Sequence, residues 1–294
     1  MTSAAKTKNL GRIALLAATL LWGISFVLMK NILENIPPLY ILAVRFCGAA
    51  LILLPFCAGK LKTLDKSYLI GGAAMGVSLL LGYLFQTFGL QLTTPGKNAF
   101  LTSTYCVITP FLYWAFIRKK PDRFNAAAAL VCIAGVGLIS LDNDLRIGTG
   151  DALTIVCGFF FALHIVMTAR YVSGRNPVIL AMLQFAAAGV ISLLGAVVFE
   201  QAPSAVSQAD LLSVVFLMIV CTAGCLLLQV YGQKYTPPSQ AAVILTLESV
   251  FGALSSVLIL NEHLTPRLAL GFALTFAAVI VSETKLGFLR KRNS

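Results

Sequence analysis

The chain has 294 residues, of which 59% are hydrophobic and 11% are charged. Soluble domains carry about 25% charged residues, so this composition excludes a soluble globule and predicts an all-α integral membrane protein. The net charge of +11 does not indicate nucleic-acid binding, because the Lys and Arg residues lie between apolar runs rather than on one basic face.

The seven cysteines lie inside apolar runs, and their odd number argues against a disulfide framework. Cys221 and Cys225 share one helix face, which packing explains better than a metal or redox site. The sequence therefore predicts no cofactor and no metal.

Ten apolar runs of about 20 residues predict ten transmembrane helices. The first follows the basic N-terminus, reaches about Met29 and lacks a cleavage site of small residues, so we interpret it as a retained span. The other nine are predicted at Pro38–Cys57, Tyr68–Leu90, Ala99–Phe116, Asn125–Leu141, Asp151–Tyr171, Pro177–Phe199, Leu211–Gln233, Gln240–Leu260 and Leu268–Glu283.

Lys and Arg residues are divided unequally between alternate linking segments. The set that includes both termini holds seventeen basic residues, whereas the other set holds four, together with most of the acids. Basic residues collect on the cytoplasmic side of a membrane protein. This asymmetry predicts a multi-pass protein of the cytoplasmic (inner) membrane with both termini in the cytoplasm.

An internal repeat divides the chain into residues 1–145 and 146–294, with five spans in each. At one constant offset, Gly11 aligns with Gly150 and Trp22 with Phe161; at an offset four residues longer, FQTFGLQLTTPGKNAF aligns with LQVYGQKYTPPSQAAV. Because five is odd, the second repeat must enter the membrane inverted. Two inverted repeats are a recurrent plan of secondary transporters, whose substrates bind between the halves near the midplane.

Charged residues at membrane depth are the first site candidates, because they are costly in lipid. Glu248 lies near the middle of the run from Pro238 to Pro266. It could bind a cation or amine, carry a proton, or be a buried acid whose hydrogen bonds to neighbouring helices only fix the packing. Arg45 could clamp a carboxylate or phosphate, or it could extend to the outer interface or pair with Glu34. His164 could relay protons or bind substrate, although a lone histidine is more often a neutral hydrogen-bond partner between helices.

Four aligned pairs of the two repeats are polar or charged at depth. They are Ser25 with His164, Arg45 with Gln184, Gln86 with Gln229, and Tyr105 with Glu248. Residues near a two-fold axis should occur in such corresponding pairs. For Gln86 and Gln229, symmetric packing is an equally simple explanation.

The fourth predicted span carries a polar stripe at spacings of four, three and four residues, formed by Asn98, Thr102, Tyr105 and Thr109. Hydroxyls and amides need partners in lipid, so the stripe should line either a cavity or a helix contact. Pro110 in the same span frees a backbone carbonyl and could kink the helix. Trp22 and Tyr83 could form aromatic walls for an organic substrate or simply fill space.

These patterns resemble the EamA-type branch of the drug/metabolite transporter superfamily. The run LESVFGALSSVLILNEHLTPRLALGFAL is similar to the family's Leu-Glu-Pro-Val…Gly-Glu-Arg-Leu-Thr pattern, with Glu248 and Glu262 on its two glutamates and Gly271 on its glycine. Arg45 matches the Arg of an Arg-Phe pair in the family's second span. Ser249 stands where the family has proline, which removes the residue that would kink the ninth span.

The resemblance implies a secondary transporter that moves a small organic solute by alternating access through a central cavity. Efflux of an amino acid or related metabolite is the commonest role that it implies. It also implies that spans one, three, four, six, eight and nine form the cavity walls. The corresponding residues are Trp22, Ser25, Tyr83, Gln86, Asn98, Thr102, Tyr105, His164, Gln229 and Glu248.

The expected partners are the solute and the lipid bilayer, with no nucleic acid. No GxxxxGK[ST] loop is present, so coupling would come from a proton or an exchanged solute. A homodimer is left open. One alternative is flipping of a lipid-linked headgroup, which would need a lateral opening between helices. Another is an intramembrane enzyme, although the sequence offers no HExxH motif and one acid at depth, so we expect no enzyme.

Overall fold

The computed structural model describes residues 3–59, 64–118, 120–121, 123–140 and 147–284. The first half of the chain forms five spans. They are α1 (Ser3–Ile32), α2 (Pro38–Cys57), α3 (Lys66–Leu92), the pair α4 (Pro95–Thr102) and α5 (Tyr105–Ile117), and α6 (Arg123–Ser140).

The second half also forms five spans. They are α7 (Thr149–Val172), α8 (Pro177–Phe199), the series α9 (Gln208–Phe216), η2 (Leu217–Gly224) and α10 (Cys225–Tyr235), then α11 (Pro238–Leu260) and α12 (Pro266–Thr284). Eight spans are long and apolar enough to cross a bilayer, and α6 and α12 contain the shorter apolar segments Ala126–Ile139 and Pro266–Ala278. The prediction of an all-α membrane protein with ten spans is confirmed.

Prolines are the first residues of five described helices, namely α2, α4, α8, α11 and α12. The residues are Pro38, Pro95, Pro177, Pro238 and Pro266. Proline suits this position because the first backbone N–H groups of a helix have no intrahelical partner, and its fixed φ angle fits the helix. The short linkers before these prolines return the chain directly into the membrane.

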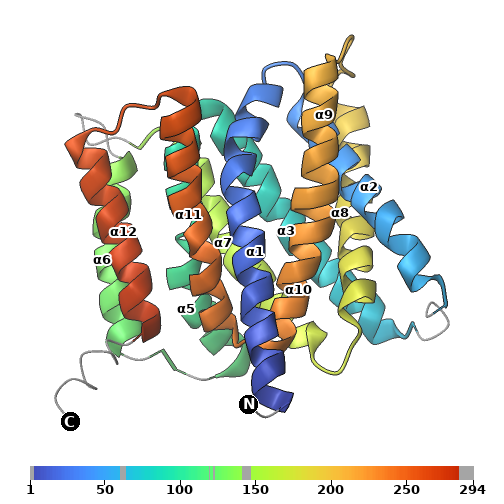
Figure 1. The fold of residues 1–294 in the computed structure, drawn as a ribbon, viewed down its shortest axis with the longest axis horizontal. Coiled ribbons are helices and arrows are strands. Elements are labelled where there is room, and N and C mark those ends of the chain that lie inside the picture. Colours follow the sequence, from blue (N-terminus) through green and yellow to red (C-terminus); the bar gives the residue numbers. More distant parts are fainter. Residues whose placement is uncertain (1–2, 60–63, 119, 122, 141–146, 285–294) are drawn as a thin grey trace.

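The two halves interlock as two inverted repeats (Figure 1). Corresponding helices pack against each other, with α2 on α8 and α6 on α12. The contact of α3 with α7 has its counterpart in α10 with α1, and that of α1 with α11 has its counterpart in α7 with α4 and α5. Because α1 and its counterpart α7 begin at opposite faces in Figure 1, the axis relating the halves lies in the membrane plane.

The fourth span is interrupted, whereas the sequence predicted one helix over Ala99–Phe116. Two residues, Ser103 and Thr104, separate α4 from α5. Thr104 Oγ1 donates to the Leu101 carbonyl at 2.7 Å, and Ser103 Oγ donates to the Ala99 carbonyl at 3.2 Å. Such side-chain bonds compete with the helix ladder, so consecutive hydroxyl residues favour a local turn. Pro110 lies inside α5, away from the interruption, and α11 runs unbroken past Ser249.

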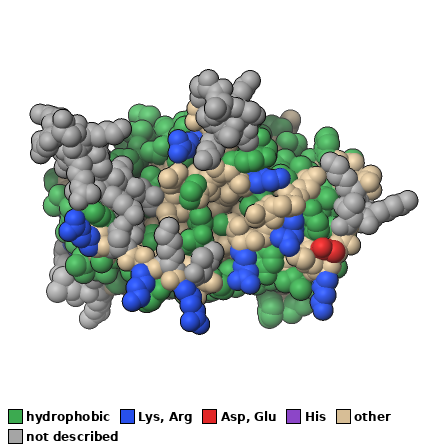
Figure 2. Space-filling model, turned by 90° about the horizontal axis from the view of Figure 1, so that it is seen from below, with side chains coloured by type: hydrophobic (Ala, Val, Ile, Leu, Met, Phe, Trp, Pro, Cys, Tyr) green, Lys and Arg blue, Asp and Glu red, His purple; other side chains and the backbone are tan. Residues whose placement is uncertain are grey.

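Basic residues gather on the face where α1 begins and α12 ends (Figures 1 and 2). Described residues at helix ends on this face are Arg12, Lys66, Arg118, Lys120, Arg123, Arg170, Arg175 and Lys234. The opposite face carries the acids Glu34, Asp151, Glu200, Asp210 and Glu262 near helix ends. The predicted boundary between residues 145 and 146, and the predicted end of the fifth span at Leu141, lie outside the described residues.

Candidate functional site

A cavity lies between the two halves, with walls from α1, α2, α3, α5, α7, α10 and α11. About 50 Å³ is open to the centre of a water molecule, which is room for a few waters. The cavity is lined by Trp22, Ser25, Arg45, Tyr83, Gln86, Tyr105, His164, Gln229 and Glu248 from the predicted set. The structure thus brings together side chains from seven helices and both repeats.

Arg45 is a buried cation in this cavity, with a side chain that is 3% exposed. Its Nε donates to Thr222 Oγ1 at 3.0 Å, and its guanidinium carbon lies 4.9 Å from the centre of the Tyr83 ring. No carboxylate among the described residues lies within ion-pairing distance of it, so the predicted pairing with Glu34 does not occur. A buried cation without a counter-ion is costly, and a bound anionic group would offset that cost.

The partner of Arg45 comes from η2, a π-helical segment that sequence reasoning missed. In η2, Thr222 Oγ1 donates to the Leu217 carbonyl at 2.8 Å, and the indole nitrogen of Trp22 donates to the Cys221 carbonyl at 2.8 Å. A π-helical turn inside a longer helix is uncommon and is frequent at functional sites. Here the segment presents the Cys221 carbonyl to Trp22 of α1 and the Thr222 hydroxyl to Arg45 of α2.

Glu248 is the second charged residue of the cavity, and its side chain is 7% exposed. It accepts a hydrogen bond at 3.2 Å from the hydroxyl of Tyr105, the first residue of α5 after the interruption. No other described residue hydrogen-bonds to Glu248, which leaves its Oε2 atom available to a solute or water. Arg45 and Glu248 are therefore opposite charges in one cavity, with neutral protein partners only.

Aromatic rings form an apolar wall beside these charges. Tyr83 packs edge-on against Phe46 and Phe161, with ring centres 5.4 Å and 5.3 Å apart. Phe161 lines the cavity but was not among the predicted site residues. The internal repeat held a signal for it, because Phe161 aligns with Trp22, the aromatic residue that lines the cavity from the other half.

His164 lines the cavity but is engaged by its neighbours. Its Nε2 atom lies 2.9 Å from Gln184 Oε1 and 3.4 Å from Thr168 Oγ1, and its side chain is buried. Gln184 is the residue that aligns with Arg45, so the repeat places a neutral pair where the first half has a cation. This environment fits a neutral imidazole that joins α7 to α8.

The other polar residues of the cavity bind mostly within the protein. Ser25 Oγ donates to the Trp22 carbonyl at 2.7 Å, Gln229 Nε2 donates to Gln233 Oε1 at 3.4 Å, and Gln86 Nε2 donates to a threonine of α4 at 3.2 Å. The first two contacts lie within α1 and within α10, and the third joins α3 to α4. Arg45 and Glu248 are the charged residues of the cavity, and neither has an ion-pair partner among the described residues.

Asn98 and Thr102 lie outside the residues that line the cavity. Asn98 Nδ2 donates to Thr154 Oγ1 at 2.8 Å and to the Gln86 carbonyl at 3.2 Å. Thr102 Oγ1 accepts from Gln86 Nε2 and lies 3.4 Å from Cys157 Sγ. Both side chains are buried. They join α4 to α3 and α7, so this part of the polar stripe lies at a helix contact.

Comparisons with known proteins agree with this architecture. The model of the EamA-like transporter family matches residues 9–141 and 148–284, one match in each half. A protein of Archaeoglobus fulgidus named an uncharacterized transporter is 35% identical over 274 residues, which cover 93% of this chain and 86% of that protein.

More distant relatives and a solved structure extend the comparison. The uncharacterized transporter YoaV of Bacillus subtilis is 22% identical, covering 92% of this chain and 95% of that protein. A WAT1-related chloroplastic protein of Arabidopsis thaliana is 23% identical, covering 88% of this chain and 66% of that protein. A crystal structure superposes with a TM-score of 0.70 over 94% of this chain and 98% of the other, at 18% identity, which supports the fold alone. The chain belongs to the EamA-like transporter family and is a multi-pass membrane transporter.

Proposed function

We propose that this protein is a secondary transporter of a small zwitterionic solute, an amino acid or a related metabolite, working by alternating access between its inverted halves. The observation that carries the proposal is the pair of opposite charges in one cavity. Within the described part of the chain, Arg45 and Glu248 are the Arg and Glu that line it, and neither has an ionic partner. A solute with one carboxylate and one ammonium group supplies both missing partners.

In this proposal, the solute carboxylate binds the guanidinium of Arg45 through parallel hydrogen bonds. The ammonium group binds Glu248, and the Tyr105 hydroxyl keeps that carboxylate in place. The apolar part of the solute packs against Trp22 and Tyr83. The free space of the cavity holds only a few waters, so binding of the solute requires the cavity walls to separate, as alternating access also requires.

The orientation follows from charge. The basic face carries the start of α1, so we place both termini in the cytoplasm and the protein in the cytoplasmic membrane. Efflux is the direction that we propose, with coupling to a proton or to an exchanged solute. Glu248 is the residue that would carry the proton, because it is the acid of the cavity. A tag at either terminus should be reachable from the cytoplasmic side alone, and labelling from outside intact cells would refute this orientation.

A thermal-shift screen of the purified protein tests the substrate class. We expect amino acids to raise the melting temperature more than matched amines, nucleosides and sugars do, because a ligand stabilises the folded state that it binds. A hit would then be tested for uptake and exchange in proteoliposomes. Stabilisation by nucleosides or sugars, with none by amino acids, would contradict the zwitterion proposal.

A second cavity favours lipid-linked headgroup flipping as the alternative. It has a volume of about 380 Å³ and is lined mainly by apolar residues of α5, α6 and α7, including Phe111 and Ile133, together with Thr104 from the interruption before α5. Thr104 directly precedes Tyr105, so the interruption of the fourth span separates this apolar cavity from the central one. Transfer of a fluorescent lipid between leaflets of proteoliposomes would support this alternative, and absence of transfer would exclude it.

A further inference from the structure

Two polar contacts at opposite ends of the solute path occupy equivalent places in the two repeats. Offsets that align the repeats place Arg12 on Asp151 and Gln240 on Lys97. Lys97 Nζ binds Asp151 Oδ2 at 2.9 Å on one face, and Arg12 Nη2 donates to Gln240 Oε1 at 3.4 Å on the other. The structure thus forms the same contact twice, once between α4 and α7 and once between α1 and α11.

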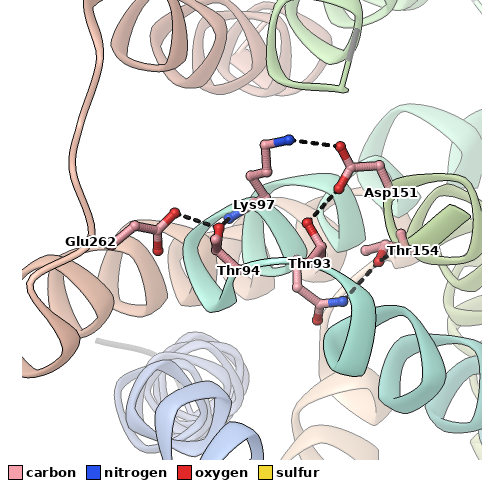
Figure 3. Close-up of polar contacts among 8 residues, drawn as sticks. Thr93, Thr94, Lys97, Asp151, Thr154 and Glu262 are labelled. Carbon is pink, nitrogen blue, oxygen red and sulfur yellow. Dashed lines mark hydrogen bonds and ion pairs between the residues drawn. The ribbon is translucent and has the colours of Figure 1, made fainter. Parts of the chain in front are cut away.

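The first contact, which we call the outer seal, is ionic and well supported (Figure 3). The Asp151 side chain is 4% exposed and that of Lys97 is 26% exposed. Thr93 Oγ1 donates a hydrogen bond of 2.5 Å to the other oxygen of Asp151. Glu262 accepts hydrogen bonds from Thr94 Oγ1 and from the Gly96 backbone N–H.

Lys30 joins α1 to the end of α3 and the linker that follows it. Its ammonium group donates to the carbonyls of Leu90, Gln91 and Thr93 at 2.8 Å, 3.1 Å and 3.0 Å. Leu90 and Met29, which precedes Lys30, both line the central cavity. The outer seal and its supports therefore lie at the outer end of the cavity. The linker between α3 and α4 is held by α1, by α7 and by Glu262, the second residue after α11.

The second contact, the inner seal, is weaker in charge, burial and distance. One partner is neutral, both side chains are exposed, and the bond is long. Thr236, which aligns with Thr93, is buried, and its hydroxyl has no hydrogen-bond partner among the described residues. Ala169 aligns with Lys30, so the inner side also lacks the lysine clamp.

A glycine pair beside each seal brings the helix backbones together. A Cβ atom on Gly89 would lie 2.9 Å from the Gly150 carbonyl oxygen, and one on Gly232 would lie 2.8 Å from the Gly11 carbonyl oxygen. These pairs also correspond under the repeat. Each seal thus lies beside a close crossing of two helices.

We infer that the Lys97–Asp151 contact is the outer gate and the Arg12–Gln240 contact the inner gate, and that the ionic outer gate biases the unloaded protein toward opening at the inner face. This inference rests on the proposed alternating access. Because opening one face requires closing the other, weakening one gate should strengthen protection at the other. The charge difference between the gates then sets which face opens more readily.

Hydrogen exchange of the full-length protein in nanodiscs, without solute, tests this assignment. In Lys97→Gln, we expect exchange to become about tenfold faster across residues 95–102, which corresponds to a decrease of about 1.4 kcal/mol in the free energy of local opening. Exchange across residues 238–245 should become slower. Gln240→Glu, which makes the inner gate ionic, should produce the opposite shifts. Exchanging the charges of the outer gate, Lys97→Asp with Asp151→Lys, should bring the pattern part of the way back, because the ion pair returns while the Thr93 bond to Asp151 is lost. Lys66→Ala, which removes a positive charge away from both gates, is the control and should change neither segment.

Faster exchange in both segments of Lys97→Gln, or no change in either, would overturn the gate assignment. Gln240→Glu keeps the test decisive if Lys97→Gln fails to fold, because it adds a charge without removing an existing ion pair. Exchange without solute does not depend on the substrate. Reciprocal shifts in a protein that ignores amino acids would therefore retain the gates and reject only the zwitterion proposal.

Discussion

Replacing Arg45 with glutamine should separate solute binding from folding stability. Arg45 is the cation that we assign to the solute carboxylate, and glutamine is a shorter side chain that keeps an N–H donor without the charge. We expect Arg45→Gln to lose most of its affinity for solutes with a carboxylate, while the unloaded protein remains about as stable as before.

The magnitude follows from the contacts of Arg45. Two hydrogen bonds between a guanidinium and a carboxylate contribute about 1.5–3 kcal/mol each, and glutamine can replace one of them in weaker form. A net loss of about 2–4 kcal/mol corresponds to a dissociation constant about 30-fold to 700-fold higher.

The stability of the unloaded protein should change little in Arg45→Gln, because the substitution removes both favourable contacts and an unfavourable desolvation cost. The substitution removes the 3.0 Å bond to Thr222, worth about 1 kcal/mol, and the Tyr83 contact, worth about 0.5–2 kcal/mol. It also removes a buried cation without a counter-ion, whose desolvation costs several kcal/mol. We therefore expect the melting temperature of the unloaded variant to lie close to that of the wild type.

Calorimetric titration with leucine, isopentylamine and 4-methylpentanoate provides the assay, since these ligands share one apolar group and differ in charge. Arg45→Gln should weaken leucine and 4-methylpentanoate and leave isopentylamine unchanged. Glu248→Gln is the matched variant and should weaken leucine and isopentylamine instead. Equal losses for all three ligands in Arg45→Gln, or an unchanged affinity for leucine where the wild type binds it, would refute the assigned role of Arg45.

Three further predictions concern coupling and packing. Glu248→Gln should abolish gradient-driven accumulation in proteoliposomes with folding intact, because the cavity loses its acid; unchanged accumulation would remove Glu248 from the mechanism. Gly89→Ala should cost about 1–3 kcal/mol and lower the melting temperature, since its Cβ would lie 2.4 Å from a threonine hydroxyl oxygen of α7. Gly148→Ala, which has open space within 4 Å, is its control, and an equal effect at both sites would argue against the close crossing. Trp22→Phe should destabilise the protein by about 1–3 kcal/mol, because the buried Cys221 carbonyl loses its 2.8 Å donor; an unchanged melting temperature would show that the π-helical segment does not need this bond.

The membrane class, the ten spans and the inverted repeat were predictable from the sequence. Hydropathy depends on local composition, and an apolar run of bilayer length must be a helix because lipid offers no hydrogen bonds to the backbone. The odd number of spans per repeat then determines inversion without any tertiary detail. The presence of Glu248 and Arg45 within predicted spans could also be read from the sequence, and the structure places both in the central cavity.

Only the tertiary structure decided which polar residues at depth face the cavity. Asn98 and Tyr105 belong to the same predicted polar stripe, yet Asn98 binds Thr154 at a helix contact and Tyr105 donates to Glu248 in the cavity. Asn98 belongs to α4 and Tyr105 to α5, and the helix is interrupted between them at Ser103 and Thr104. The rotation and axial shift of packed helices depend on contacts between segments far apart in sequence. The hydropathy of one segment does not determine those contacts.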